Sequence, residues 1–208
     1  LFHVQDVSSQ LCCLTLKPIV NETVLDICAA PGGKSFTMAE LMGNNGRVIS
    51  MDLYDARAGL IAKGAERLGL RIIEARQNNA AKFNEELPQA DKVLCDVPCS
   101  GLGVIRRKPE IKYKDEKEFE ELPRLQKAIL DVSAQYVKKG GTLVYSTCTL
   151  SRAENDEVAH EFANTHPDFS PIVQPIPYAG ADNSPMRTFF PEEDGGDGFF
   201  TASFRRIK

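Results

Sequence analysis

Two cysteines in this sequence, Cys99 and Cys148, have neighbours that favour chemistry over simple packing. Each follows a short apolar run, and Asp96 lies three residues before the first of them. A thiolate is a strong nucleophile, and a second group beside it can move a proton or help the sulfur to leave. Methylation of cytosine at C5 needs both, because a thiolate that adds at C6 must later be eliminated. Asp96 could hydrogen-bond N3 and the exocyclic amine of such a base.

The other cysteines carry a weaker signal. No two of the six have CxxC spacing or a histidine at zinc-site distance, so we expect neither a disulfide framework nor a metal site. The three histidines are scattered, which disfavours a hydrolase that uses a Ser-His-Asp or Cys-His arrangement. Four cysteines are instead predicted to be small buried hydrophobic residues: Cys12, Cys13, Cys28 and Cys95.

Short apolar runs alternate with longer segments of helical periodicity, a pattern typical of a parallel sheet with helices on both faces. The predicted strands are Val24–Cys28, Arg47–Met51, Ile72–Ala75, Lys92–Cys95 and Thr142–Tyr145. The predicted helices are Ser35–Met42, Ala56–Leu68 and Pro123–Lys138, with glycines at or just beyond their ends. Cys99 and Cys148 then follow the fourth and fifth strands, at the carboxyl edge where open α/β sheets bind ligands.

The rest of the chain is predicted to complete one domain. A further helix is expected at Arg152–Thr165, followed by a Pro-rich stretch at Pro171–Pro191 and a Gly-rich turn at 194–198. Phe199–Ile207 is predicted to be a terminal strand, antiparallel to the others. Residues 1–23 are expected to form a helical lead-in that packs on the sheet, and 24–208 to form the catalytic domain.

A glycine-rich loop lies between the first predicted strand and the helix that follows it. In Asp26–Ser35, small residues would let backbone N–H groups approach a nucleotide-like ligand closely. Gly33-Lys34-Ser35 also resembles the end of a phosphate-binding P-loop, with Val93–Asp96 as a magnesium-binding strand. That pattern requires glycine at position 28, where this chain has a cysteine whose Cβ would hinder wrapping around phosphates.

Asp52 helps to choose between ligands for this loop. It ends the second predicted strand, where a doubly wound nucleotide-binding sheet places the carboxylate that binds ribose hydroxyls. NAD is disfavoured because GxGxxG spacing is absent. S-adenosylmethionine has no pyrophosphate to cradle and suits this looser loop, so it is the expected cofactor.

The overall charge argues against binding nucleic acid through a broadly basic surface. The net charge is −4, so any such contact must be local. A local basic segment follows Cys99, and we expect its side chains to grip phosphates, the alternative being a solvated loop: Arg106, Arg107, Lys108 and Lys112. Neither a signal peptide nor a membrane-spanning segment is visible, so a cytoplasmic monomer without membrane contact is expected.

Taken together, these motifs resemble those of the 5-methylcytosine RNA methyltransferases of the Sun/Fmu type, which include bacterial enzymes acting on 16S ribosomal RNA. The resemblance spans nearly the whole chain and rests on Gln5-Asp6 with Ser8-Ser9-Gln10, Asp26–Lys34, Asp96–Gly101, Ile105–Lys112, Gly141–Cys148 and Asp197–Phe200. It implies a Rossmann-like S-adenosylmethionine-dependent methyltransferase fold: a mostly parallel seven-stranded sheet, helices on both faces and an antiparallel C-terminal strand. It also implies that the chain is the catalytic domain without the family's N-terminal RNA-binding domain.

The resemblance assigns roles to particular residues. Cys148 is implied to be the nucleophile and Cys99 to assist product release, with Asp96 in the reaction centre. The implied cofactor contacts are Cys28, Ala29, Ala30, Pro31, Gly32, Gly33, Lys34, Asp52, Asp96 and Asn79. Asn79, or Asn78 if the alignment slips by one, stands where the family usually has Asp, and its carbonyl can still accept a hydrogen bond from the adenine amine.

The predicted reaction is methyl transfer to C5 of a cytosine in RNA, most simply 16S ribosomal RNA, with the target base extruded into the pocket between the cysteine loops. Three alternatives remain open from sequence: a transfer RNA substrate, a P-loop ATPase, and a catalytically silent RNA-binding scaffold that has kept the fold.

Overall fold

A computed structural model describes residues 2–115, 117–173 and 184–208 of the chain. The strands are β1 (Thr23–Asp26), β2 (Arg47–Asp52), β3 (Ile73–Gln77), β4 (Ala90–Asp96), β5 (Val137–Thr147), β6 (Phe169–Pro171), β7 (Met186–Phe189) and β8 (Phe199–Arg206). The α-helices are α1 (Val7–Leu16), α2 (Gly33–Leu41), α3 (Asp55–Leu68), α4 (Lys117–Glu120), α5 (Leu122–Gln135), α6 (Asp156–Thr165) and α7 (Pro191–Asp194). Short 3₁₀ helices occupy Leu102–Val104 and Pro109–Tyr113.

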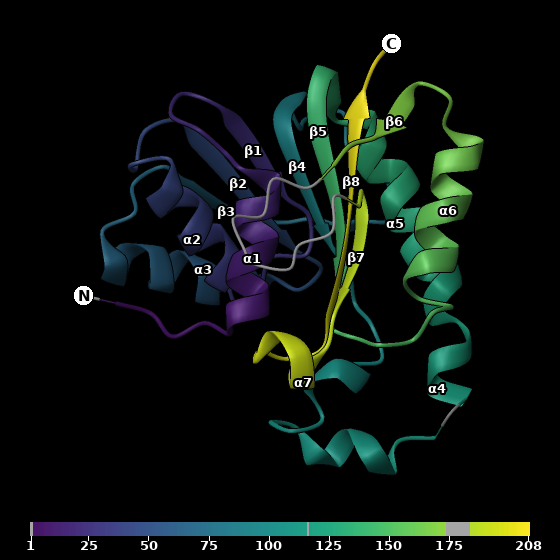
Figure 1. The fold of residues 1–208 in the computed structure, drawn as a ribbon. Coiled ribbons are helices and arrows are strands. Elements are labelled where there is room, and N and C mark those ends of the chain that lie inside the picture. Colours follow the sequence, from purple (N-terminus) through teal and green to yellow (C-terminus); the bar gives the residue numbers. More distant parts are fainter. Residues whose placement is uncertain (1, 116, 174–183) are drawn as a thin grey trace.

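One mixed sheet runs through the centre of the molecule, in the order β3-β2-β1-β4-β5-β8-β6 (Figure 1). β1 to β5 are parallel, and β8 is antiparallel to β5, as predicted. In the described part of the chain, the sheet has eight strands rather than the predicted seven. The difference arises because β6 and β7 both pair with one edge of β8, β6 near its end and β7 near its start, so the sheet is still seven strands wide.

Helices cover both faces of this sheet because side chains of its central strands alternate between two cores. Leu25, Ile49 and Val93 pack with α5 and α6 in one core. Val24 and Val48, one residue earlier in their strands, belong to the other core, with α1, α2 and α3. Figure 1 shows α2 and α3 on one side of the sheet and α5 and α6 on the other.

Some predicted boundaries are wrong for identifiable reasons. The helix predicted at Pro123–Lys138 ends at Gln135, because Val137 already pairs with Ala90 of β4. The helix predicted at Arg152–Thr165 begins at Asp156. Within the lead-in, α1 packs against α2, β5 and β8. Of the predicted Pro-rich stretch, residues 174–183 lie outside the described residues, and β6 and β7 at its two ends were not predicted.

Among the described residues, Cys12, Cys13 and Cys95 are fully buried, which confirms their prediction as packing residues. Cys28 is half-buried and packs against the core beneath α5 and α6. Burial raises the pKa of Cys12 and of Cys95 to about 12, so both stay protonated and unreactive. No helix in the described part of the chain is long and apolar enough to cross a membrane. In the same residues, no cluster of three or more His, Cys, Asp or Glu side chains could hold a metal ion.

Candidate active site

The structure brings Cys99 and Cys148 together at the carboxyl edge of the sheet. β4 and β5 are neighbours, and their register pairs Asp96 with Ser146, so the two cysteine loops leave the sheet from a shared position. The Sγ atoms lie 3.2 Å apart, within hydrogen-bonding range for sulfur. Two thiols 49 residues apart in the chain thus lie in direct contact.

The two thiols differ in acidity. A hydrogen bond from Cys99 lowers the pKa of Cys148, although burial acts in the opposite direction. Lys34 and Lys108 lower the pKa of Cys148 further through their charges. The same hydrogen bond and burial raise the pKa of Cys99 well above its usual value. This arrangement favours a Cys148 thiolate that accepts a hydrogen bond from a protonated Cys99. A nucleophile with an assisting thiol requires this distribution of charge.

Asp96 connects the cysteines to the glycine-rich loop. Its Oδ2 lies 2.8 Å from Lys34 Nζ, and its Oδ1 accepts a hydrogen bond from Ser146 Oγ at 2.8 Å. Lys34 also lies over the Phe199 ring. Burial would lower the pKa of Lys34, but the Asp96 carboxylate raises it overall, so the lysine stays charged. Lys34, which would contact phosphates in the P-loop alternative, is therefore ion-paired with Asp96 instead.

The predicted cofactor loop, Cys28–Lys34, is tied into the sheet by its own backbone. Ala29 N–H donates to Met51 O at 2.7 Å, and Gly32 N–H donates to Ala29 O at 2.8 Å. Gly32 has a φ of +112°, and a Cβ there would collide with the Phe36 ring. Helix α2 starts at the next residue, and its N-cap, Gly32, has no side chain to accept a hydrogen bond, so the first N–H groups of α2 remain available to a ligand.

Asp52 ends β2 beside this loop, as predicted for a ribose-binding carboxylate. Its two oxygens each accept a hydrogen bond from Arg57 Nε at 3.0 Å, and another nitrogen of Arg57 donates to Ala30 O at 3.1 Å. Arg57 therefore orients Asp52 and joins it to the loop. Sequence analysis did not identify Arg57, although an arginine in the first turns of the helix after such an Asp is a readable signal.

Asn79 and Asn78 follow β3 at the same edge of the sheet. Asn79 is exposed, and its Oδ1 accepts a hydrogen bond from Ala81 N–H at 3.0 Å. The oxygen predicted to meet the adenine amine therefore already closes a local turn, with one lone pair left. Asn78 N–H donates to Asp52 O at 2.9 Å, and its side chain accepts from Asn84. Asn79 as an adenine contact stays a prediction.

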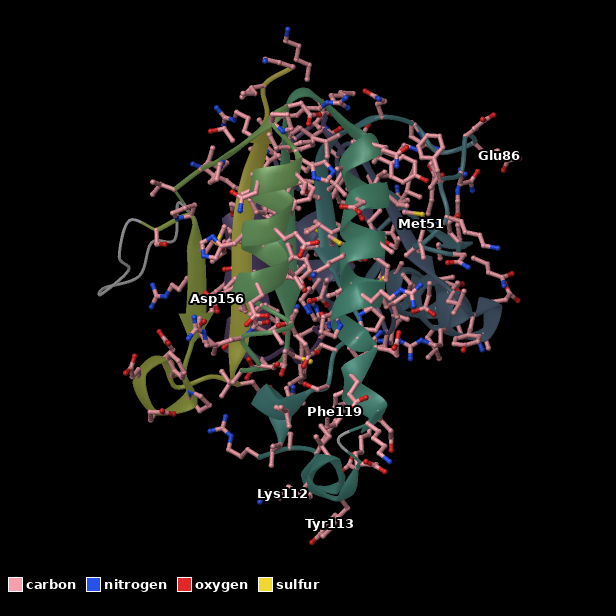
Figure 2. The ribbon with its side chains drawn as sticks, turned by 90° about the vertical axis from the view of Figure 1, so that its right-hand side faces the viewer. Met51, Glu86, Lys112, Tyr113, Phe119 and Asp156 are labelled. Carbon is pink, nitrogen blue, oxygen red and sulfur yellow. The ribbon has the colours of Figure 1, made fainter. Side chains whose placement is uncertain are left out.

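The basic segment after Cys99 divides into two groups. Arg107 Nε donates to Asp197 Oδ2 at 2.6 Å, and Arg106 lies 3.8 Å from the other oxygen of this carboxylate, which is 2 % exposed. Through Asp197, these arginines anchor the glycine-rich turn at residues 194–198. Lys108 and Lys112 are exposed and have no acidic partner within 4 Å among the described residues. Figure 2 shows Lys112 and Tyr113 at the tip of a lobe that extends beyond the end of the sheet.

Asp26, at the end of β1, is fully buried below the loop. Its Oδ2 accepts a hydrogen bond from Ser35 Oγ at 2.6 Å, while its Oδ1 has no hydrogen-bond partner among the described residues. Burial raises the pKa of Asp26 to about 7. A raised carboxyl pKa contributes stability that is fully present below the unfolded-state pKa near 3.9 and is lost as pH rises through the folded-state value.

We therefore expect Asp26 to make the free energy of unfolding fall between about pH 4 and pH 7. The size of this effect is on the order of 4 kcal/mol. In Asp26→Asn the pH dependence should flatten, as measured by urea unfolding from pH 4 to 8. Asp55→Asn, at an exposed position in α3, is the control and should keep the wild-type slope. An unchanged slope in Asp26→Asn would show that this carboxyl group stays ionised in the folded protein.

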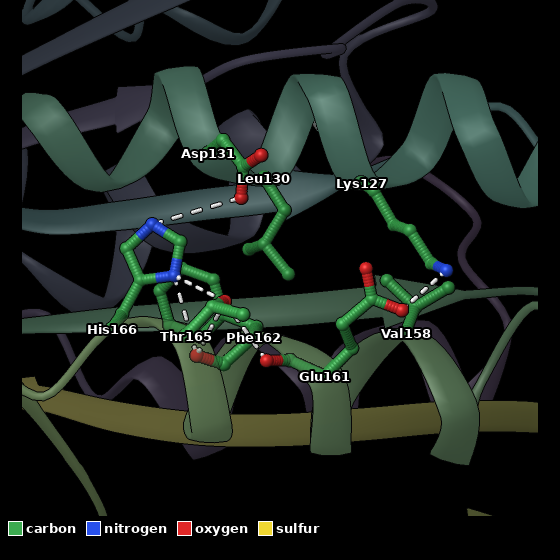
Figure 3. A pocket seen from close by; sticks show the side chains of 8 residues that line it. All are labelled: Lys127, Leu130, Asp131, Val158, Glu161, Phe162, Thr165 and His166. Carbon is green, nitrogen blue, oxygen red and sulfur yellow. Dashed lines mark hydrogen bonds and ion pairs between the residues drawn. The ribbon is translucent and has the colours of Figure 1, made fainter.

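A cavity of about 180 Å³ lies away from this site, between α5 and α6 (Figure 3). Lys127 and Glu161 form an ion pair across it at 2.5 Å, and His166 lies 3.7 Å from Asp131 at its other end. It contains none of the predicted site residues. The ion pair between Lys127 and Glu161 joins the two helices, and the cavity is not the candidate active site.

The family model described as 16S rRNA methyltransferase RsmB/F matches residues 13–205. The "Probable ribosomal RNA small subunit methyltransferase B" of Bacillus subtilis (strain 168) is 48% identical over 211 residues, covering 98% of this chain and 47% of its own length. The "Ribosomal RNA small subunit methyltransferase B" of Photorhabdus laumondii subsp. laumondii is 37% identical, covering 96% and 46%. The chain thus spans about half the length of these relatives.

Solved structures show the same similarity. That of PH0851 has a TM-score of 0.92 and 33% identity, covering 98% of this chain and 47% of the other. That of NSun6 from Pyrococcus horikoshii with SFG has a TM-score of 0.88 and 30% identity, covering 100% and 53%. These matches extend over the sheet and both cysteine loops, and they confirm the predicted methyltransferase fold.

Proposed function

Because the chain belongs to the RsmB/F family of 16S rRNA methyltransferases, we propose that it methylates C5 of a cytosine in ribosomal RNA through a covalent bond between Cys148 and C6. The observation that carries the proposal is the pair of thiols 3.2 Å apart, in which Cys148 has the lowered pKa. A thiolate beside a protonated thiol, with a carboxylate three residues before one of them, fits addition to a pyrimidine ring and later elimination.

The residues around the loop fit S-adenosylmethionine. Asp52 offers a nearly buried carboxylate for ribose hydroxyls, and the uncapped N-terminus of α2 offers N–H groups for the amino-acid carboxylate. The Asp96 carboxylate favours a positively charged ligand nearby. When bound, this cofactor supplies a methyl group on a sulfonium. The Lys34–Asp96 ion pair would then place the cofactor loop against the cysteines.

The protein's own residues have separate roles in the proposed reaction. Cys148 adds to C6, which makes C5 nucleophilic, and the Asp96 carboxylate accepts a hydrogen bond from the exocyclic amine of the base. After methyl transfer, the C5 proton is removed and the bond from Cys148 to C6 breaks, a step in which Cys99 assists. A raised pKa suits Cys99 to this role, because a group that holds its proton firmly is a strong base once it is deprotonated.

Lys108 and Lys112 are the proposed RNA contacts, because Arg107 is bound to Asp197. The charge of Lys108 also lowers the pKa of Cys148, which supports a position for this lysine near the target base. Lys108→Ala should weaken RNA binding and reduce the salt dependence of affinity by about one phosphate contact. Fluorescence anisotropy at several salt concentrations measures both. An unchanged salt slope would remove Lys108 from the interface.

Active-site variants test the proposal. Cys148→Ser and Cys99→Ala are incubated with a 16S ribosomal RNA fragment and cofactor carrying a labelled methyl group. Cys148→Ser should lose methyl transfer, and Cys99→Ala should accumulate a covalent protein–RNA complex that survives denaturation. Full methylation by Cys148→Ser would overturn the mechanism. Transfer RNA in parallel tests the alternative substrate, and calorimetry with S-adenosylhomocysteine and Mg-ATP tests the ATPase alternative.

A further inference from the structure

A buried polar cluster lies directly behind the two cysteine loops. Its centre is Glu154, 2 % exposed, which sequence analysis did not single out. The Glu154 carboxylate accepts hydrogen bonds from Ser100 N–H at 2.9 Å and Ser100 Oγ at 2.6 Å. It also accepts one from Gln126 Nε2 at 2.9 Å. Three donors converge on one buried carboxylate, and two of them belong to the residue that follows Cys99.

The cluster joins the two cysteine loops to each other. Because Ser100 Oγ gives its proton to Glu154, the 2.7 Å contact between Ser100 Oγ and Thr149 Oγ1 must be donated by Thr149. Thr149 follows Cys148, as Ser100 follows Cys99. The chain of hydrogen bonds from Thr149 through Ser100 to Glu154 therefore fixes one loop relative to the other.

Each cysteine is held on both sides by this cluster. Gln126 Nε2 donates to Pro98 O at 2.9 Å, on the other side of Cys99. Asn155 Oδ1 accepts from Thr147 Oγ1 at 2.5 Å, and its Nδ2 donates to Thr149 O at 2.9 Å. The residues before and after each thiol are thus anchored to buried side chains.

The anchors themselves come from the α5–α6 layer. Gln126 lies on α5, and Glu154 and Asn155 immediately precede α6. The two helices pack together and are clamped by the ion pair between Lys127 and Glu161 (Figure 3). Tyr145 of β5 also donates to the Glu154 backbone carbonyl at 2.5 Å. The cluster therefore has a rigid foundation that does not depend on the cofactor loop.

We propose that Glu154 is a positioning residue that sets the separation of the Cys99 and Cys148 thiols and thereby the rate at which the methylated base is released. This inference rests on the proposed function. While Cys148 is bonded to C6, it carries no charge, so Cys99 can lose its proton to solvent. Cys99 then accepts the C5 proton, the electrons of the C5–H bond re-form the C5–C6 double bond, and the C6–S bond breaks to return its electron pair to Cys148.

Two substitutions separate positioning from folding. Glu154→Ala leaves three buried donors without an acceptor and frees the two loops from each other. In Glu154→Gln, the amide oxygen can still accept from Ser100 N–H and Gln126, while the amide nitrogen donates to Ser100 Oγ, whose proton turns toward Thr149. The glutamine variant should therefore preserve the cluster with the order of protons reversed. Glu157→Gln, at an exposed position in the first turn of α6, is the matched control.

The experiment measures methyl transfer and release separately, by rapid quench of a single turnover with 16S ribosomal RNA fragment. We expect Glu154→Ala to slow release by roughly 10- to 100-fold, because a displacement near 1 Å at a reacting group has an effect of that size. Covalent protein–RNA complex should accumulate, while calorimetric affinity for S-adenosylhomocysteine changes by less than about threefold. Glu154→Gln and Glu157→Gln should release product at close to the wild-type rate.

A double variant tests whether Glu154 acts through Cys99. If Glu154 acts through Cys99, then Glu154→Ala combined with Cys99→Ala should release no more slowly than Cys99→Ala alone. The inference would be overturned if the two substitutions slowed release additively, or if Glu154→Ala released product at the wild-type rate. It would also be overturned if Glu154→Ala lost cofactor affinity and cooperative melting in parallel with release. Cys148→Ser separates the two proposals. Full methylation by that variant overturns the proposed function and this inference with it, whereas an inactive Cys148→Ser beside normal release in Glu154→Ala overturns the inference alone.

Discussion

Gly103→Ala is expected to destabilise the protein by about 3 kcal/mol and to slow methyl transfer by roughly 100-fold. Gly103 N–H donates to Cys148 O at 3.0 Å, and Gly103 O accepts from Gly198 N–H at 2.9 Å. A Cβ at position 103 would overlap the Gly198 carbonyl and lie 2.9 Å from Cys148 O. Both neighbours are backbone atoms, so neither can give way without moving a loop that carries or supports the nucleophile.

The measurements for Gly103→Ala are guanidinium unfolding and single-turnover methyl transfer. Gly59→Ala is the matched control, because Gly59 lies within α3 and a Cβ there meets nothing within 4 Å. That variant should be as stable as wild type or more stable by up to about 1 kcal/mol, since alanine favours helix. Wild-type stability and rate in Gly103→Ala would show that the segments carrying Gly103, Cys148 and Gly198 can move apart without loss of stability or activity.

Lys34→Met is expected to slow methyl transfer at pH 7 by at least about tenfold. Removing the ammonium leaves the Asp96 carboxylate without its partner at 2.8 Å. Asp96 raises the pKa of Cys148 and Lys34 lowers it, so the loss of Lys34 should raise that pKa and reduce the fraction of thiolate. The acidic limb of the pH–rate profile should therefore move to higher pH.

Lys34→Arg is the control, because it keeps a positive charge beside Asp96. Part of the rate lost in Lys34→Met should return as pH is raised from 7 to 9, whereas Lys34→Arg should need no such rise. The profile is measured by single-turnover methyl transfer with saturating cofactor, so that weaker cofactor binding does not enter the rate. A loss of equal size at every pH would show that Lys34 acts only by holding Asp96 in place.

Much of the fold could be predicted because the hydrophobic pattern is strong. The buried strand Arg47–Asp52 reads clearly as an apolar run that follows a glycine-rich turn. Boundaries failed where tertiary pairing overrides local preference. Val137 has helical neighbours, yet its backbone pairs with Ala90, and β5 therefore starts earlier than its apolar run. The short strands β6 and β7 have no pattern of their own, and their pairing with β8 defines them.

The cysteines could be predicted as a pair because strand order places both loops at one edge. Arg107 could not be separated from its basic neighbours, because its partner Asp197 lies 90 residues away. Glu154 was missed for the same reason. Its hydrogen bonds reach residues 28 and 54 positions away, and a lone glutamate before a helix resembles many solvated ones.

The pairing of Asp96 with Ser146 has a consequence for which parts of this protein can vary. Cys99 lies three residues after Asp96, and Cys148 lies two residues after Ser146. A single-residue insertion in either loop would shift one sulfur relative to its partner. The exposed segment around Gly140, near the start of β5, is separated from the thiols by five positions paired with β4. Peptide tags or fluorescent labels inserted there should leave the reaction centre undisturbed.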